Sequence, residues 1–469
     1  MGGIREAVLL LFCMAMMVVA VRRWYWSLCS LMFLTVVMQH PSMPKMILGI
    51  QGMNPWNATF LVIAVFWMID RLAGRPRART SPIATVLFVS YFLMILVAGI
   101  LGAVDAGSVK MGQQRFNTGW MIVDGMINPL KYLMVGLMFY DGVRSRNDVW
   151  MALLSAVGSG FAYAGLMFKS MNIRVFTIDY EDARRMTDKL IGLFANDMGE
   201  LLAFTMWSAV FVALLLRKRW QQIACWAVNV ATLPPFIALK SRAGFLAFCA
   251  VGLALGGLRW RKILLLLPVV VVGIIAVSPS ARDRVTTGFA EGGEDANWDE
   301  ISAGRLTNIW PPVIEEIEQS PLFGYGRYAI LRQDCAFTIL EGEGQLPLHP
   351  HNSYLEILLD CGALGLILCL LCMAGLFTVT SSLMRTRGDP LTTTIGAVGF
   401  IAVVAELTAG VAGSSFYPGQ SSVPYLCIWG TAMRLRAELT QARKTAPATS
   451  VSWSPANYGR PLATARRPL

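Results

Sequence analysis

Charged residues are scarce in this sequence. Asp, Glu, Lys and Arg make up 15% of the 469 residues, whereas a soluble domain carries about 25%. The hydrophobic set reaches 55%, and the mean hydropathy is +0.54. Runs such as 7–21, 263–277 and 364–379 are nearly free of charge, and a membrane-spanning helix needs about 20 mostly apolar residues. This composition excludes a soluble enzyme and a disordered protein, and the runs lack the polar–apolar alternation of a transmembrane β-barrel.

Metal-binding and disulfide-forming residues are also few. The chain has 3 His and 9 Cys, and only Cys335 among the cysteines lies in a long polar loop. The others fall in apolar stretches, where Cys behaves as a small hydrophobic residue. No Cys-x-x-Cys spacing indicates a zinc site, and Asp295 and Asp299 are too far apart for an Asp-x-Asp motif. The sequence therefore excludes a disulfide scaffold and predicts no metal and no cofactor.

What the chain does have is a succession of apolar segments. They predict about 13 spans, near 7–21, 24–38, 47–69, 80–103, 119–140, 149–168, 199–216, 220–238, 243–258, 263–277, 354–379, 391–409 and 421–433. Arg22 and Arg23 divide one apolar stretch, so the first two segments are either two helices or one broken hairpin. We expect an all-α polytopic membrane protein with about 12–13 transmembrane helices and one long, partly helical loop.

Positive charge divides the loops into two groups. The formal net charge is +11, from 40 Lys+Arg and 29 Asp+Glu. The cations gather in alternate short loops and in the C-terminal tail, which the positive-inside rule assigns to the cytoplasm. Segment 278–356, on the other side, has 5 cations against 13 acidic residues. The basic net charge therefore reports membrane orientation, and the hydropathy argues against nucleic acid as a partner.

Four regions follow from this pattern. We predict a transmembrane helical region at 1–277, an external loop with the candidate motifs at 278–353, C-terminal transmembrane helices at 354–434 and a disordered cytoplasmic tail at 435–469. The tail is rich in Pro, Ala, Thr and Arg and has too few apolar residues for a core. A loop of this length is usually functional or disordered, and its aromatic residues favour order.

Two of the three histidines lie where the long loop meets the next span, in Leu348-His349-Pro350-His351-Asn352-Ser353-Tyr354-Leu355-Glu356. A His-x-His metal site would need more ligands, and the loop has no further histidine. A Ser353-x-x-Glu356 capping box would account for those two residues but not for the histidines. An imidazole that titrates near neutral pH suits a general base.

A second pattern lies earlier in the same loop, at Ser302–Trp310. Ser302 is expected to cap a short helix that carries Arg305. Pro311 and Pro312 are expected to interrupt that helix. A lone arginine is most often a solvated surface residue, so Arg305 by itself has two interpretations.

The third pattern is Lys240-Ser241-Arg242, between two apolar spans. The simple interpretation is a snorkelling pair of cations in a short hairpin. The alternation of loops, however, places the pair on the external side, against the positive-inside preference. A cation at a membrane edge on the disfavoured side is a candidate site, and the same alternation places it with Arg305 and His351.

Together these motifs resemble those of the O-antigen ligase and Wzy-type O-antigen and exopolysaccharide polymerase superfamily. The similarity covers roughly residues 190–380. It rests on four motifs in this order: Gly304-Arg305-x4-Trp310, Pro321-Leu322-Phe323-Gly324-Tyr325-Gly326, His349-x-His351-Asn352-x-Tyr354-Leu355-Glu356 and Cys361-Gly362-Ala363-Leu364-Gly365. The elements at 241–244 and 193–197 match more weakly.

The resemblance implies a metal-independent, inverting glycosyltransferase in the bacterial inner (cytoplasmic) membrane, with its active site facing the periplasm. The implied donor is a glycan on an undecaprenyl-pyrophosphate carrier. The implied acceptor is a second carrier-linked glycan in a polymerase or lipid A–core in a ligase. The motifs do not separate these two activities.

Residue roles follow from the same resemblance. Arg305 and Arg242, with Lys240 as a weaker third, would bind the pyrophosphate, because a guanidinium matches phosphate oxygens in pairs. His351 is the first candidate for the base and His349 the second, with Glu356 as an orienting group. The alternative function is a transporter or flippase without bond-making chemistry, which intramembrane charges would favour.

Overall fold

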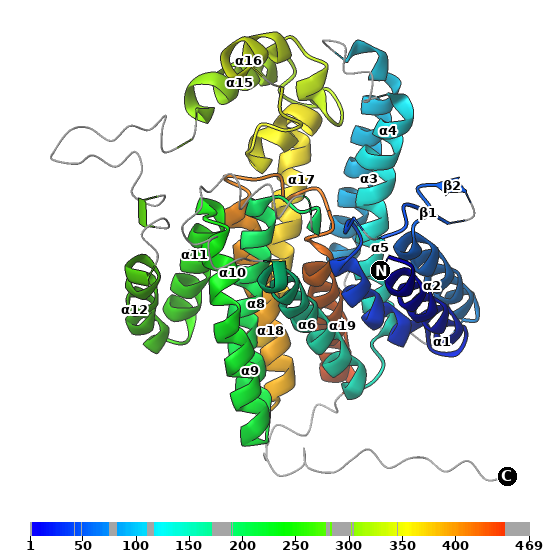
Figure 1. The fold of residues 1–469 in the computed structure, drawn as a ribbon, viewed down its shortest axis with the longest axis vertical. Coiled ribbons are helices and arrows are strands. Elements are labelled where there is room, and N and C mark those ends of the chain that lie inside the picture. The colour runs from blue at the N-terminus through cyan, green and yellow to red at the C-terminus, as the bar shows by residue number, and fades with distance from the viewer. Residues whose placement is uncertain are drawn as a thin grey trace.

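The computed structural model describes residues 2–74, 82–109, 117–170, 191–277 and 304–445, except 42, 48 and 345, together with residues 189, 282–283 and 302. Helices make up nearly all of the secondary structure in these ranges (Figure 1). Six of the described helices are long and apolar enough to cross a membrane, and three further apolar helices are shorter. The predicted class, an all-α multi-pass membrane protein, is confirmed.

The first half of the chain contributes two short strands and a set of helices. The strands β1 (Met46–Ile47) and β2 (Ile50–Gln51) pair antiparallel. The helices are α1 (Gly2–Val36), α2 (Pro55–Leu72), α3 (Pro82–Val104), the 3₁₀ turn η1 (Ala106–Ser108), α4 (Thr118–Ile122), the π-helical turn η2 (Val123–Ile127), α5 (Asn128–Gly142) and α6 (Arg146–Ser170).

The second half contributes the centre of the bundle and a layer outside it. Its elements are α8 (Ala195–Leu215), α9 (Arg219–Ala231), α10 (Leu233–Ala238), α11 (Arg242–Leu258), α12 (Lys262–Val277), the π-helical turn η4 (Arg305–Ile309), α15 (Trp310–Gln319), the 3₁₀ turn η5 (Ala329–Leu331), α16 (Cys335–Glu343), α17 (Ser353–Met384), α18 (Pro390–Ala409) and α19 (Val423–Thr445). Helix α18 contacts α8, α11, α17 and α19 and is buried along most of its length. Each predicted span therefore has a helical counterpart, some of them shorter than a full crossing.

Helix α1 is broken near its middle. Arg23 has non-helical backbone angles (φ −142°, ψ 61°). The Ser27 hydroxyl donates a hydrogen bond to the Met16 carbonyl at 2.7 Å, whereas in a straight helix these residues would lie about 16 Å apart. The chain therefore turns back on itself at Arg23, and the two predicted spans at 7–21 and 24–38 form one broken hairpin.

Helix α17 has a break that fits the loop before α16. Gly362 has φ 65° and ψ −171°, a conformation that is essentially restricted to glycine. Ala363 N donates to Pro321 O at 2.8 Å, and Gly326 N donates to Asp360 O at 2.8 Å. The Pro-Leu-Phe-Gly-Tyr-Gly turn is thus bound along α17 by backbone hydrogen bonds, and a side chain at Gly362 would overlap the backbone of Leu322.

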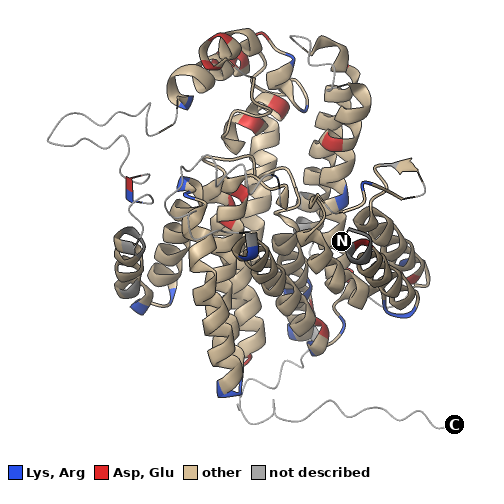
Figure 2. Cartoon of the chain, in the orientation of Figure 1, with Lys and Arg blue, Asp and Glu red and all other residues tan. Residues whose placement is uncertain are grey.

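Helices α15 and α16 form a separate layer beyond the end of the bundle, and Figure 1 shows them at the top. Their buried residues form a second, smaller core that includes Val313, Leu331, Ile339 and Leu359 of α17. Figure 2 shows acidic residues gathered on α15 and α16. The predicted loop is therefore ordered over its described part, 304–344 and 346–352.

Two expectations for local structure were wrong. Pro311 and Pro312 do not interrupt a helix, because they occupy the first turn of α15, where the missing N–H groups have no intrahelical partner in any case. The predicted tail does not begin at 435, because α19 continues to Thr445. Arg434 and Glu438 pair at 2.8 Å along this extension, and Leu439 packs against the core. Residues 446–469 lie outside the described part.

Candidate functional site

One backbone carbonyl joins two of the predicted elements. The Ala412 carbonyl, in the loop between α18 and α19, accepts hydrogen bonds from Arg305 Nη1 at 3.3 Å and from Asn196 Nδ2 at 3.0 Å. Asn196 Oδ1 in turn accepts from the Ser241 hydroxyl at 2.9 Å. Arg305 is therefore connected through a short chain of hydrogen bonds to the 240–242 element between α10 and α11.

Close helix packing holds the 240–242 element in place. The Ser241 hydroxyl caps α11 by accepting from Gly244 N at 3.1 Å. A Cβ on Gly244 would lie 2.9 Å from Gly199 Cα, so α11 approaches α8 this closely because the position is glycine. Lys240 is only 6% exposed and has a left-handed backbone (φ 46°), and Arg242 is half-buried. Both cations act in a medium less polar than water, which strengthens their pull on an anion.

The two histidines contact each other at the start of α17. Their ring centroids lie 4.4 Å apart, and His351 N donates to His349 Nδ1 at 3.2 Å. His351 has a left-handed backbone (φ 54°). The next residue, Asn352, caps α17 through its side chain, which accepts from Tyr354 N at 2.9 Å and Leu355 N at 3.2 Å. The cap and the backbone turn together fix where the His351 ring projects.

Electrostatics set the protonation state of His349. Burial, together with the positive charges of Arg327 and Arg305, lowers the pKa of His349 to about 3. His349 is therefore neutral near pH 7, and because its Nδ1 accepts a hydrogen bond, its proton is on Nε2. A base this weak suits donating a hydrogen bond better than removing a proton. The structure also brings His349 near α8, since the rings of His349 and Phe194 lie 6.4 Å apart.

An arginine that sequence reasoning missed lies under this site. Arg327 is 7% exposed and forms ion pairs with Glu356 and with Asp360, the latter at 3.0 Å. Its guanidinium also lies 3.6 Å from the ring centroid of Tyr417 and 4.1 Å from that of Tyr328. Two signals pointed to it: Arg327 directly follows the Gly-Tyr-Gly turn, and Asp360 is a lone charge in an apolar run that needs a partner.

The structure gives Glu356 and Ser353 different partners from those expected. The expected capping box is absent, because Asn352 occupies the cap position and the Ser353 hydroxyl donates to Gly413 O at 3.1 Å. Glu356 Oε1 binds Arg327. Glu356 therefore anchors the loop that precedes α16. Its described contacts favour this anchoring role over the predicted role of orienting a histidine. The expected Ser302 cap is also wrong, because Gly304 occupies the cap position of η4, although the Ser302 hydroxyl does accept from Leu306 N at 3.2 Å.

Within the described residues, no group of three or more His, Cys, Asp or Glu side chains is arranged to hold a metal ion. Asp295 and Asp299 lie outside those residues. The described site is instead a convergence of cations with two imidazoles: Arg305, Arg242, Lys240, His349 and His351 all lie where α8, α11 and α17 meet the extramembrane layer.

The fold defines a multi-pass membrane protein, and the described contacts bring arginines and two histidines together beyond one end of its helix bundle. Comparison with known proteins shows what this region is similar to. Residues 227–370 match the O-antigen ligase family model, and this region carries all four of the motifs quoted above. This match supports the resemblance read from those motifs, and over this region the chain is similar to the O-antigen ligase family.

Curated relatives show a similarity of the same kind. A Rickettsia felis protein named "Putative polysaccharide ligase" is 29% identical over 212 residues, which are 42% of this chain and 50% of the relative. A Rickettsia prowazekii protein of the same description is 30% identical over 212 residues, with the same coverage. The matched part of the chain thus spans about half the length of each relative.

Proposed function

We propose that this protein is an inverting glycosyltransferase that moves a glycan from an undecaprenyl-pyrophosphate carrier to a sugar hydroxyl at the periplasmic face of the bacterial inner membrane. The observation that carries the proposal is the position of Arg305. Its guanidinium hydrogen-bonds to the carbonyl that also holds Asn196, and its charge acts on His349. One arginine thus links the 240–242 cations with the histidine pair.

The charges favour a pyrophosphate at this position. Arg305 and Arg242 offer planar donors to phosphate oxygens, and Lys240 adds a third cation. Two carboxylates at the start of α17, Glu356 and Asp360, are already paired with Arg327. An anionic leaving group is therefore attracted here, although the loop as a whole is acidic.

The bond changes can be written for this arrangement. The acceptor hydroxyl oxygen attacks the anomeric carbon of the donor sugar from the face opposite the pyrophosphate. A new C–O bond forms, the C–O bond to the pyrophosphate breaks, and the carrier pyrophosphate leaves with the bonding electrons. His351 takes the hydroxyl proton, and the arginines stabilise the negative charge that develops on the leaving group. Neutral His349 donates from Nε2 and positions the backbone of His351.

The test is glycan transfer by the purified protein with a carrier-pyrophosphate-linked glycan and a glycan or lipid A–core acceptor. His351→Ala should lower kcat by about 100-fold or more, the range expected for loss of a general base. Arg305→Ala should lower kcat by a similar factor. Arg282→Ala, an exposed arginine in the same loop, is the matched control and should keep full activity. Unchanged transfer by both site variants would refute these roles.

A transporter is the competing function. Charged residues within the membrane-spanning helices would favour it if they were available to bind a solute or an ion. Lys131 donates to Asn128 Oδ1 at 2.8 Å and to Asn57 Oδ1 at 3.0 Å. Asp360 binds Arg327. Lys131 and Asp360 are thus each engaged by other side chains, which favours a structural role for these two residues. Movement of a glycan carrier without any new glycosidic bond would support the transporter instead.

A further inference from the structure

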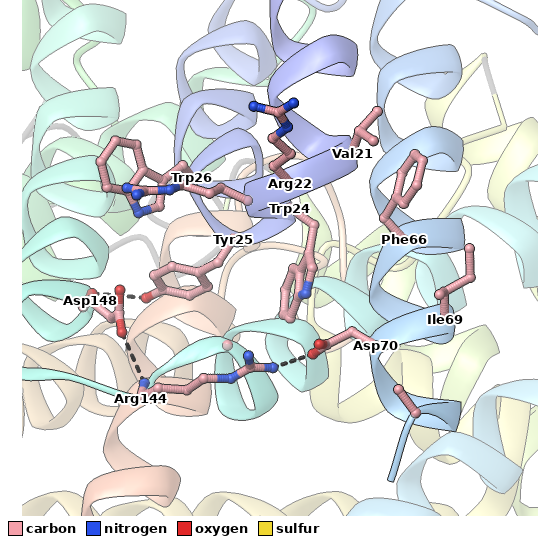
Figure 3. Close-up of a pocket in the computed structure, with 13 residues that line it drawn as sticks. Val21, Arg22, Trp24, Tyr25, Trp26, Phe66, Ile69, Asp70, Arg144 and Asp148 are labelled. Carbon is pink, nitrogen blue, oxygen red and sulfur yellow. Dashed lines mark hydrogen bonds and ion pairs between the residues drawn. The ribbon is translucent and has the colours of Figure 1, made fainter. Parts of the chain in front are cut away.

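The break in α1 opens a pocket far from the site described above. The pocket has a volume of about 300 Å³ and is lined by residues of α1, α2 and the α5–α6 connection. Figure 3 shows aromatic rings of Trp24, Tyr25 and Trp26 around it, with Arg22 above and Arg144 below. Arg23 also lines it. None of these residues belongs to the proposed glycosyltransferase site.

The pocket lies at the opposite membrane surface from Arg305. Gly125, in the η2 turn of the continuous helical rod formed by α4, η2 and α5, packs against Arg327, which precedes η5 in the layer outside the bundle. The rod then runs through the bundle, and the pocket is formed where it ends, at Gly142 and Arg144. About 17 residues of helix span about 26 Å, most of the thickness of a bilayer core.

The carboxylates of the pocket are already engaged. Asp70 forms an ion pair with Arg144. Asp148 Oδ2 accepts from Arg144 N at 3.0 Å and from the Ser145 hydroxyl at 2.8 Å. The Tyr25 hydroxyl donates to the Asp148 carbonyl at 2.9 Å. The hydrogen-bonding groups of both carboxylates are thus engaged, and three arginines against two aspartates in the lining leave the pocket a formal net charge of +1.

The two adjacent arginines are the positive part of the pocket. Within the described residues, no ion pair includes Arg22 or Arg23. The Arg23 guanidinium lies 4.4 Å from the ring centroid of Trp26, which leaves its edge available for hydrogen bonds. Arg22 lines the pocket as well, and each of the two guanidinium groups can donate to phosphate oxygens.

The rim of the pocket is apolar and exposed. Val21 is 57% exposed, Ile69 54% and Trp26 44%. Trp at the membrane–water interface keeps its polar edge near the headgroups while its ring faces the acyl chains. The pocket thus combines a cationic centre with an apolar rim on the side that faces the bilayer, which matches an amphiphile better than a soluble anion.

We propose that this pocket binds the phosphate of an anionic membrane phospholipid, with Arg22 and Arg23 on the phosphate oxygens and the acyl chains along Val21, Trp26 and Ile69. Basic pockets between transmembrane helices on the positively charged side of a membrane protein recognise such headgroups. A bound lipid would also bridge the two halves of the α1 hairpin, because Arg22 and Arg23 lie at its turn.

Lipid retention by the full chain tests this proposal. The protein is purified in a non-ionic detergent, incubated with phosphatidylglycerol or phosphatidylcholine, and analysed by native mass spectrometry. The double variant Arg22→Gln/Arg23→Gln should bind phosphatidylglycerol about tenfold more weakly, the effect of losing one or two hydrogen bonds to a charged group. Phosphatidylcholine binding should stay low and unchanged.

The matched control is Arg217→Gln/Arg219→Gln. These arginines lie between α8 and α9, at the end of α8 away from His349 and so at the same membrane surface as the pocket. The two substitutions remove the same amount of charge as Arg22→Gln/Arg23→Gln and should leave phosphatidylglycerol binding unchanged. Arg22→Lys/Arg23→Lys guards against misfolding, because it keeps the charge and should retain part of the binding.

Three results would overturn the proposal. Equal loss of phosphatidylglycerol in both glutamine variants would show attraction to surface charge in general. Equal retention in the parent and in Arg22→Gln/Arg23→Gln would show that the two arginines hold no lipid. Displacement of the lipid by an equal concentration of glycerol 3-phosphate would identify a site for soluble phosphates.

Discussion

The Arg327 guanidinium donates to Asp360 Oδ2 over 3.0 Å, and the Arg327 amide donates to Ala98 O at 2.7 Å. One residue of the extramembrane layer is thereby bound to both α17 and α3. The His349–His351 segment leads directly into α17. The ion pair therefore fixes the helix whose first turn presents the histidines.

Loss of this arginine should destabilise the fold strongly. Arg327→Ala leaves Glu356 and Asp360 as buried carboxylates without their cation, and breaking such a pair costs about 3–5 kcal/mol. A large fall in Tm in detergent, followed by tryptophan fluorescence, is the expected result. Arg146→Ala is the control, because Arg146 is 60% exposed and its pair with Asp389 is worth less than about 1 kcal/mol. Similar losses in the two variants would contradict a structural role for Arg327.

Replacement of Asn196 should reduce catalysis more than stability. Asn196→Ala removes the link between the Ala412 carbonyl and Ser241. Arg305 and the 240–242 element are then no longer held in a fixed relative position by this residue. We expect kcat to fall by about 10- to 100-fold, since small displacements of binding groups have effects of this size. Glycan transfer and Tm are measured on the same preparation.

The control for Asn196 is Thr378→Ala, which removes a hydroxyl bonded only within its own helix in the described contacts. It should change neither activity nor Tm. A fall in Tm for Asn196→Ala without a change in kcat would show that the bridge serves the fold alone.

Acid should destabilise the protein through His349. Its pKa is lowered to about 3 in the folded state, whereas an unfolded histidine has a pKa near 6.5. Between these values the unfolded state binds more protons, so this residue's contribution to stability is full above about pH 6.5 and is lost as pH falls toward 3. Tm in one detergent at pH 7.5 and pH 5 measures it.

His349→Asn is the diagnostic variant for that pH dependence. It keeps an acceptor for the His351 amide but does not titrate. The difference in Tm between the two pH values should shrink in this variant. An undiminished difference would assign the acid sensitivity to other groups.

The break in α17 should not tolerate a side chain. Gly362→Ala requires both a glycine-only backbone conformation and space that the Leu322 backbone occupies, so a cost of about 3 kcal/mol or more is expected. Gly388→Ala is the matched control, because Gly388 has φ 88° but open space around it. Its cost should be near 1–2 kcal/mol. Equal effects on Tm would mean that the docking of the loop on α17 contributes little.

Much of the architecture is determined by the sequence alone. Segments with few charges predict helices wherever they are long enough, because a backbone in lipid must satisfy its hydrogen bonds internally. The gathering of Lys and Arg in alternate loops predicts on which side of the membrane each loop lies. The order of the motifs predicts the resemblance to the O-antigen ligase family. The position of Arg305, the histidine pair and the 240–242 element on one side followed from counting spans.

The tertiary structure decided which side chains are partners. Glu356 looked like a capping residue, and only the fold brings Arg327 to it from 29 positions away. Asn196 joins Arg305 to Ser241 through the carbonyl of Ala412, a backbone atom that no motif can reveal. Periodicity and composition describe each helix by itself, whereas ion pairs and hydrogen bonds between distant segments depend on how the helices pack. The sequence therefore predicts which residue types belong to the candidate site. Their contacts depend on helix packing, which only the fold determines.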